Sequence, residues 1–319
     1  MPAPLLRQVL QRIVLGLLML LGVSALIFAG TQLLPGDVAQ SILGQEATPE
    51  AVANLRKEMG LNEPAAARYF HWLGGALTGD FGKALSNGQP IAATLAKRLS
   101  NTLFLAFWAA VVSVPLAIGL GIVAARHRNG LVDRLISGLG LASVSLPEFF
   151  VAYVLMYFFA VKLQWLTSVS TVFDGMPFKE RLGAIVLPVM VLTLAVLAHM
   201  MRMTRAAILN VMQSAYIETA ELKGLSALQV IYRHALPNAL APIINVVMLN
   251  LAFLVVGVVV VEVIFVYPGM GQYLVDHVSK RDVPVVQACG LIFATVYIGL
   301  NIVADIAGVM SNPRLRHPK

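Results

Sequence analysis

Charged residues are scarce in this sequence, and their scarcity excludes a soluble protein. Asp, Glu, Lys and Arg account for 12% of the 319 residues, whereas 58% are hydrophobic. A soluble domain carries about twice that share of charge. The composition therefore predicts an integral membrane protein. The net charge of +7 does not require a nucleic-acid partner, because the positions of the basic residues explain it, as described below.

Cysteine is nearly absent as well. Cys289 is the only one, so the chain can form neither an internal disulfide nor a cysteine-based metal cluster. Its apolar surroundings indicate a packing role. The stretch HMMRM (199–203) is also interpreted as packing, because no two of the six histidines have the spacing of metal ligands. We predict no metal site.

Three enzymatic motifs are missing. The sequence contains no G-x-x-x-x-G-K-[ST] phosphate loop, no H-E-x-x-H and no G-x-S-x-G. We therefore predict that this chain has no catalytic site and that any nucleotide is bound elsewhere.

Long apolar runs dominate the rest of the sequence. A helix crosses the ~30 Å hydrocarbon core with about 20 apolar residues. Six stretches are long enough: 13–34, 102–124, 136–161, 184–201, 243–266 and 286–310. The first follows Arg7 and Arg12 as in a signal peptide, but it exceeds the roughly 7–15 residues of a signal's apolar region. It is interpreted as a retained anchor.

The basic residues orient these spans. If the N-terminus is inside, the inner segments 1–12, 125–135, 202–242 and 311–319 carry 12 Lys and Arg, and the short outer loops carry five. This asymmetry follows the positive-inside rule. Both termini are therefore predicted to be cytoplasmic.

The outer segment after the first span is too long for a simple connector. Within it, TPEAVANLRKEMG has Thr48 as an N-cap, Pro49 at the first helical position and Gly60 as a terminator. RYFHWLGGAL (68–77) predicts a second, interfacial helix. We expect a mainly helical insertion on the outer membrane surface.

A charged interruption separates the fourth and fifth spans. We expect the helix of span four to continue through AAILNVMQSAYIETAELK and to stop at Gly224, which tolerates positive φ. Ser226 and Gln229 have the spacing of a capping box, so a second helix should begin there. Pro237 should then limit that helix. The pattern predicts two short helices with Gly224 at the corner.

This corner could be a hairpin resting on lipid headgroups or a socket for a protein partner. Ala220, Gly224 and Ser226 are small residues that would let a partner approach closely. The segment also mixes both charge signs, whereas a membrane-lying helix usually has a basic polar face. These observations favour a protein contact.

Residues 218–237 resemble the EAA loop of binding-protein-dependent ABC importer permeases. The matching positions are Glu218, Ala220, Gly224, Leu236 and Pro237, while Thr219 and His234 depart from the pattern. Other motifs are similar to the peptide and nickel branch of this family: LLPGD (33–37), LRKEMGLNEP (55–64), GDFG (79–82), RLSNTLFLA (98–106), EVIFVYPGMGQYL (262–274) and NPRLR (312–316). Residues that differ from those common in the branch include Ala215, Glu221 and Leu222.

The resemblance implies an all-α polytopic membrane protein with six transmembrane helices and the type I ABC importer permease fold. It divides the chain into a cytoplasmic stub with helix 1 (1–34), a helical periplasmic insertion (35–97), a core of helices 2–6 (98–310) with a coupling loop (213–237), and a cytoplasmic tail (311–319). The implied function is that of a permease subunit of an ATP-driven importer in the bacterial inner membrane. Its solutes would be peptides or peptide-like molecules.

The same resemblance implies the partners and the coupling residues. The partners are a second homologous permease, two ATPase subunits or domains, which would bind ATP and Mg²⁺, and a periplasmic substrate-binding protein. No cofactor is implied for this chain. The residues placed at the ATPase contact are Tyr216, Ile217, Glu218, Thr219, Ala220, Lys223, Gly224, Leu225 and Ser226.

Polar residues inside the spans are costly, so they are candidates for the substrate pathway. The candidates are Glu148, Asn245, Asn250 and Glu262. Glu262 either lies at the outer mouth of the pathway or satisfies backbone groups where its helix breaks. Asn245 and Asn250 either line the pathway or join helices by hydrogen bonds. Glu148, next to Pro147, marks a kink or bounds a cavity.

Two other classes of membrane protein remain as alternatives. One is an ion-driven secondary transporter, although no clear internal repeat is present. The other is an intramembrane enzyme, although no nucleophile and base pair stands out. The sequence does not distinguish among a dipeptide, a longer peptide, glutathione, an opine and a nickel complex as the solute.

Overall fold

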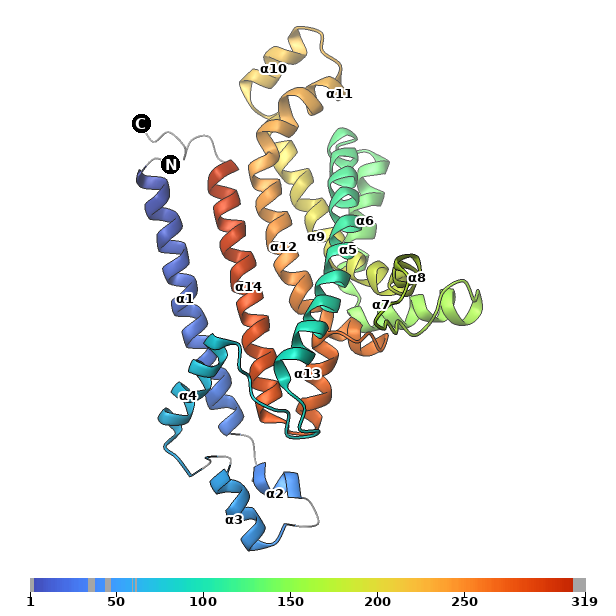
Figure 1. Ribbon diagram of the computed structural model, residues 1–319. Helices are drawn as coiled ribbons and strands as arrows, with labels where there is room; N and C mark the ends of the chain where they lie inside the picture. The colour runs from blue at the N-terminus through green and yellow to red at the C-terminus, as the bar shows by residue number, and fades with distance from the viewer. Residues whose placement is uncertain (1–2, 34–37, 44–46, 59, 61, 312–319) are drawn as a thin grey trace.

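The computed structural model in Figure 1 describes residues 3–33, 38–43, 47–58, 60 and 62–311. Regular secondary structure in the described part is helical, and one isolated β-bridge joins Lys83 and Pro90 in a connecting segment. Its helices are α1 (Ala3–Gln32), α2 (Val38–Leu43), α3 (Pro49–Glu58), α4 (Ala65–Thr78), α5 (Ile91–Arg126), α6 (Leu131–Ser145), α7 (Glu148–Leu155), α8 (Phe178–Ala184), α9 (Val186–Met212), α10 (Ala215–Leu222), α11 (Ala227–Val230), α12 (Leu236–Ile264), α13 (Met270–Ser279) and α14 (Val283–Ser311). Two π-helical segments, η2 (Met156–Lys162) and η3 (Ile231–Ala235), complete it.

Five helices are long and apolar enough to span a membrane. They are the α1 stretch Arg7–Gln32, α5, α9, the run Ala227–Ile264 that ends in α12, and the α14 stretch Val283–Gly308. These correspond to the first, second, fourth, fifth and sixth stretches expected from the sequence. The all-helical polytopic fold is therefore confirmed.

The third expected span, 136–161, is not one helix. The segments Leu131–Ser143 and Glu148–Lys162 are bent against each other by 103° and form a broken span at most. The break has a local cause. Pro147 lacks an N–H and disfavours the helical conformation in the residue before it, and Leu146 is accordingly extended, with φ −96° and ψ 132°. Glu148 is therefore at a kink, as one interpretation of the sequence held.

The segment after α1 contains the two expected helices. The hydroxyl of Thr48 accepts a hydrogen bond from the backbone N–H of Ala51, as an N-cap residue of α3 would. α4 packs against the C-terminal third of α1, where Tyr69 meets Phe28 edge to face at 5.5 Å and its hydroxyl lies 2.8 Å from that of Ser24. The tail from residue 312 onward lies outside the described residues.

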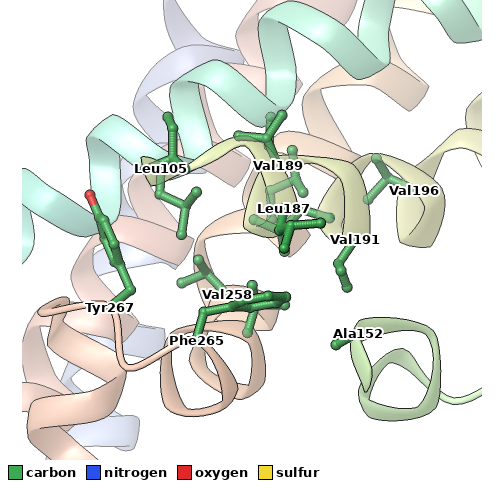
Figure 2. Close-up of a cluster of buried hydrophobic side chains, with 14 of the residues drawn as sticks. Leu105, Ala152, Leu187, Val189, Val191, Val196, Val258, Phe265 and Tyr267 are labelled. Atoms are coloured by element: carbon green, nitrogen blue, oxygen red, sulfur yellow. The ribbon is translucent and has the colours of Figure 1, made fainter. Parts of the chain in front are cut away.

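The main hydrophobic core joins the spans. Figure 2 shows part of it, with Leu105 of α5, Leu187 and Val189 of α9 and Val258 of α12 directed toward one another. Burial of such side chains contributes about 1.5–3 kcal/mol each in water, but in a bilayer close packing supplies most of the association. The α10–α11 pair projects at one end of the molecule, together with the start of α1 and the end of α14, and α2 and α3 lie at the opposite end (Figure 1).

Candidate functional site

The α10–α11 pair, with the turns around it (residues 213–235), forms a projection that we call the knob. The knob is a separate element, because α9 ends at Met212 and Ser214 is extended, with ψ 145°. The expectation of one helix running from span four to Lys223 is therefore wrong. The break has no sequence signal as strong as glycine or proline, and the hydroxyl of Ser214 donates to the carbonyl of Val211 and does not cap α10.

Gly224 forms the corner of the knob. Its φ is +81°, a conformation that favours glycine. The N–H of Gly224 donates to the carbonyl of Glu221 at 2.9 Å, and the N–H of Leu225 donates to the carbonyl of Ala220 at 3.4 Å. These two bonds are those of a Schellman motif. A Cβ at Gly224 would meet nothing within 4 Å, so the backbone conformation, not crowding within this chain, requires glycine.

The second helix of the knob begins with the expected capping box. The hydroxyl of Ser226 accepts from the N–H of Gln229 at 3.4 Å, and the side chain of Gln229 accepts from the N–H of Ser226 at 3.0 Å. This pair satisfies two donors that a helix start leaves free. The corner is therefore fixed on both sides by local bonds.

Pro237 does not limit the second helix as the sequence led us to expect. The chain passes through the π-helical segment η3 straight into α12, and Ala227–Ile264 forms one apolar run. Proline removes a backbone donor at this point. The side-chain amide of Asn238 donates to the carbonyl of His234 at 2.7 Å and adds a bond at this junction. The knob is thus joined to α12 without a loop.

A second buried cluster anchors the knob to the spans. Ile217 and Ala220 of α10 are 1% and 5% exposed. The cluster also contains Ile122 and Ala125 of α5, Ala207 and Ile208 of α9, Val230, Ile231, Ala235, and Ala239 and Ile243 of α12. Because three spans share this cluster with α10, a displacement of the knob must also displace their ends.

The outer surface of the knob carries most of the expected coupling residues. The exposed ones are Tyr216, Glu218, Thr219, Lys223, Gly224 and Ser226, while Leu225 is half-buried. Ile217 and Ala220 face the chain's own interior, so a partner could not reach them directly. Three further apolar residues of the knob are exposed, namely Leu222, Leu228 and Tyr232, and Leu222 is 82% exposed. Sequence reasoning missed them as contacts, although large apolar side chains in a polar segment are a usable signal.

An ion pair between a buried carboxylate and a half-buried guanidinium joins α6 to α9. The guanidinium of Arg205 donates two hydrogen bonds to the carboxylate of Asp133, at 2.7 and 2.6 Å. Asp133 is buried, and it also accepts from the N–H of Asn129 at 2.9 Å. From the sequence, Arg205 was only one of the basic residues in the inner segment 202–242. The pair joins residues 72 positions apart, so no local pattern indicates it.

Glu262 is a structural residue in this conformation. Its carboxylate accepts hydrogen bonds from the hydroxyl of Thr102 at 2.6 Å and from the N–H groups of Gly271 and Gln272 at 2.7 and 3.1 Å. It is fully buried. These bonds support the alternative in which Glu262 satisfies backbone groups at the helix break, and its assignment to the pathway stays a prediction.

The same break is held by a second group of bonds. The hydroxyl of Tyr267 donates to the carbonyl of Asn101 at 2.8 Å, and the amide of Asn101 donates to the carbonyl of Pro268 at 2.9 Å. Burial raises the pKa of Tyr267, which keeps the phenol a donor. The connection between α12 and α13 is therefore tied to α5 from several sides.

The remaining pathway candidates lie on α12 and α7. Asn250 is buried, with its amide 2.8 Å from the carbonyl of Val246 and 3.1 Å from Nδ1 of His199 on α9. It therefore joins two helices, as one alternative for it held. Asn245 is exposed on α12 near Gly308 of α14, and Glu148 begins α7. Among the described residues, no group of three or more His, Cys, Asp or Glu is arranged to hold a metal ion.

Comparisons with known proteins match nearly the whole chain. A family model described as "Binding-protein-dependent transport system inner membrane component" matches residues 117–317, and the model of the corresponding N-terminal part matches residues 5–106. A relative named "Probable peptide ABC transporter permease protein y4tP", from Sinorhizobium fredii, is 33% identical over 97% of this chain and 99% of its own. The "Glutathione transport system permease protein GsiC" of Salmonella typhimurium is 36% identical over 98% of this chain and 100% of its own.

A solved structure shares the fold. It is an inward-facing form of the MetNI methionine ABC transporter, and one of its chains matches with a TM-score of 0.56 at 18% identity. The match covers 69% of this chain and 96% of the other. At this identity the likeness concerns the arrangement of helices alone.

Proposed function

The chain belongs to the family of binding-protein-dependent transport system inner membrane components and is an ABC importer permease, and we propose that its knob couples the spans to a cytoplasmic ATPase. The observation that carries this proposal is the construction of the knob. Its surface is exposed, its corner is fixed by the Schellman bonds and the capping box, and its underside belongs to a core shared with α5, α9 and α12.

Coupling of this kind requires two separate faces on the knob. The outer face would seat in the ATPase through Tyr216, Glu218, Thr219, Lys223 and Ser226, with Leu222, Leu228 and Tyr232 adding apolar contact. The inner face, formed by Ile217 and Ala220, would carry the resulting movement to the spans. Packed cores shift as units and do not deform continuously, so closure of the ATPases would change how the three spans are packed.

The permease would act with the partners that the family assembles. We propose a second homologous permease, two ATPase subunits or domains that bind ATP and Mg²⁺, and a periplasmic binding protein that delivers the solute. The knob, the start of α1 and the end of α14 would face the cytoplasm of a bacterium, since they lie at one end of the molecule (Figure 1) and the basic segments are on that side.

The proposed solutes are peptides or peptide-like molecules. The support comes from the relatives, which are named as a peptide permease and as a glutathione permease. Family membership also sets aside the ion-driven carrier and the intramembrane enzyme as leading alternatives.

The test uses the complex purified through a tagged copy of this chain and reconstituted into proteoliposomes. Gly224→Asp should leave the chain in the membrane but abolish ATP-dependent uptake of a peptide mixture, because the substitution places a carboxylate at the corner of the outer face. Gly88→Asp is the matched control, since Gly88 also has positive φ (67°), open surroundings and a position away from the knob. Normal uptake by the Gly224→Asp complex would contradict the proposal.

A further inference from the structure

The turn between α5 and α6 (residues 126–134, here called the basic turn) is a preformed element. Asn129 has φ +63°, and its N–H donates to the carboxylate of Asp133 at 2.9 Å. Ser137 donates to the same carboxylate at 3.3 Å. These bonds close the turn before any partner arrives.

The only acidic residue of the basic turn is already neutralised. Asp133 is occupied by the two hydrogen bonds from Arg205 of α9. Arg126, Arg128 and Arg134 are all exposed, and none of them has an acidic partner among the described residues. The Nδ1 atom of His127 lies 3.0 Å from the carbonyl of Val123, so this side chain belongs to the end of α5. The turn therefore presents three guanidinium groups without counter-charges.

An exposed apolar stripe continues from the basic turn along α6. Leu131, Leu135 and Leu139 follow one another at intervals of four residues, which places them on one face of the helix. They are 77%, 65% and 72% exposed. The cationic turn is thus followed directly by a strip of hydrocarbon surface on α6.

We propose that the basic turn and the leucine stripe form a binding site for an anionic phospholipid. The guanidinium groups would bind the phosphate through paired N–H donors, and an acyl chain would lie along the stripe. A soluble acidic partner would have no use for the stripe. A second permease packed on the stripe would leave the unpaired arginines at its edge. A phospholipid can contact both the arginines, through its phosphate, and the leucine stripe, through its acyl chain.

The leaflet in which this site lies rests on the proposed function, because the turn is at the knob's end of the molecule (Figure 1). Anionic lipids are attracted to juxtamembrane arginines on the cytoplasmic side. The binding itself does not depend on transport, so it can be tested even if the knob has another role.

The experiment measures lipid retained by the complex, purified through the full-length tagged chain, by native mass spectrometry. Dioleoyl phosphatidylglycerol is the probe, and dioleoyl phosphatidylethanolamine is the comparison. The variant combines Arg126→Gln, Arg128→Gln and Arg134→Gln. The control combines Lys83→Gln, Lys179→Gln and Lys280→Gln, which remove the same number of positive charges from exposed positions outside the basic turn.

We expect the arginine variant to lose affinity for phosphatidylglycerol on the order of 100-fold. The control variant should keep its affinity for phosphatidylglycerol, and the affinity for phosphatidylethanolamine should not change in either variant. Leu135→Asn, which keeps all three arginines, should weaken the binding of dioleoyl but not of dihexanoyl phosphatidylglycerol. Equal retention by the arginine variant would overturn the proposal. The proposal would also be overturned if the arginine variant kept its lipid but lost an ATPase or the second permease, since the surface would then belong to a protein partner.

Discussion

Glu262 of α12 accepts a 2.6 Å hydrogen bond from the hydroxyl of Thr102 on α5. The same hydroxyl accepts from the N–H of Met270, the first residue of α13. One carboxylate and one hydroxyl thereby hold the start of α13 against two spans. Glu262, a polar residue inside a span, thus holds the connection between α12 and α13 in place.

Glu262→Gln should therefore lower stability. An amide cannot accept at both positions, so either Thr102 or the N–H groups of Gly271 and Gln272 would face a donor. Leaving buried groups unpaired costs about 1–3 kcal/mol. The thermal unfolding midpoint in detergent, followed by tryptophan fluorescence, should fall. An unchanged midpoint combined with altered solute preference would return Glu262 to the pathway.

Substitutions at Gly224 should rank by their tolerance of positive φ. Asparagine visits this conformation readily, whereas a β-branched residue does so at a cost of about 1–2 kcal/mol or more. We expect Gly224→Asn to keep most of the ATPase activity of the complex and Gly224→Val to lose it. Phosphate release by the purified complex measures this. Equal loss in both variants would show that the surface at Gly224, and not its backbone, is what matters.

The two faces of the knob should respond differently to truncation. Ile217→Ala removes a buried side chain and should cost about 2–5 kcal/mol by leaving a cavity. Leu222→Ala changes an exposed side chain and should leave stability within about 0.5 kcal/mol, yet reduce the ATPase recovered with the tagged chain. Unfolding and co-purification measured on both variants separate the faces. If Leu222→Ala destabilises as much as Ile217→Ala, the division into an inner and an outer face is wrong.

Breaking the pair between Asp133 and Arg205 should be worse than removing both charges. Arg205→Met leaves a buried carboxylate with only weaker partners, which costs about 3 kcal/mol at a site of this burial. The double variant Asp133→Leu with Arg205→Met should recover much of that loss. A double-mutant cycle on unfolding free energies checks the coupling. Additive effects would mean that the two residues act independently.

Local features of the fold were predictable from the sequence. The apolar runs, the capping box of Ser226 and Gln229 and the corner at Gly224 each depend on residues within a few positions of one another. Features that depend on distant residues were not. Glu262 accepts a hydrogen bond from Thr102, which lies 160 positions away in the sequence. Asp133 accepts one from Arg205, which lies 72 positions away.

Proline shows why even local signals can mislead. Pro147 breaks the third span, whereas Pro115 lies inside α5, Pro242 lies inside α12 and Pro237 is absorbed at the start of α12. The difference depends on how the surrounding helices compensate for the hydrogen bond that proline removes. Such compensation requires the three-dimensional arrangement.

The central claim is that the outer face of the knob touches an ATPase, and a photo-crosslinking residue in place of Leu222 tests it most directly. After irradiation of native membranes, we expect an adduct with an ATP-binding subunit, identified by mass spectrometry. The same residue in place of Trp165, which is 72% exposed and lies outside the knob, should give no such adduct. If the crosslinker at position 222 reacts only with lipid, or with the same proteins as at position 165, the knob is not the coupling surface.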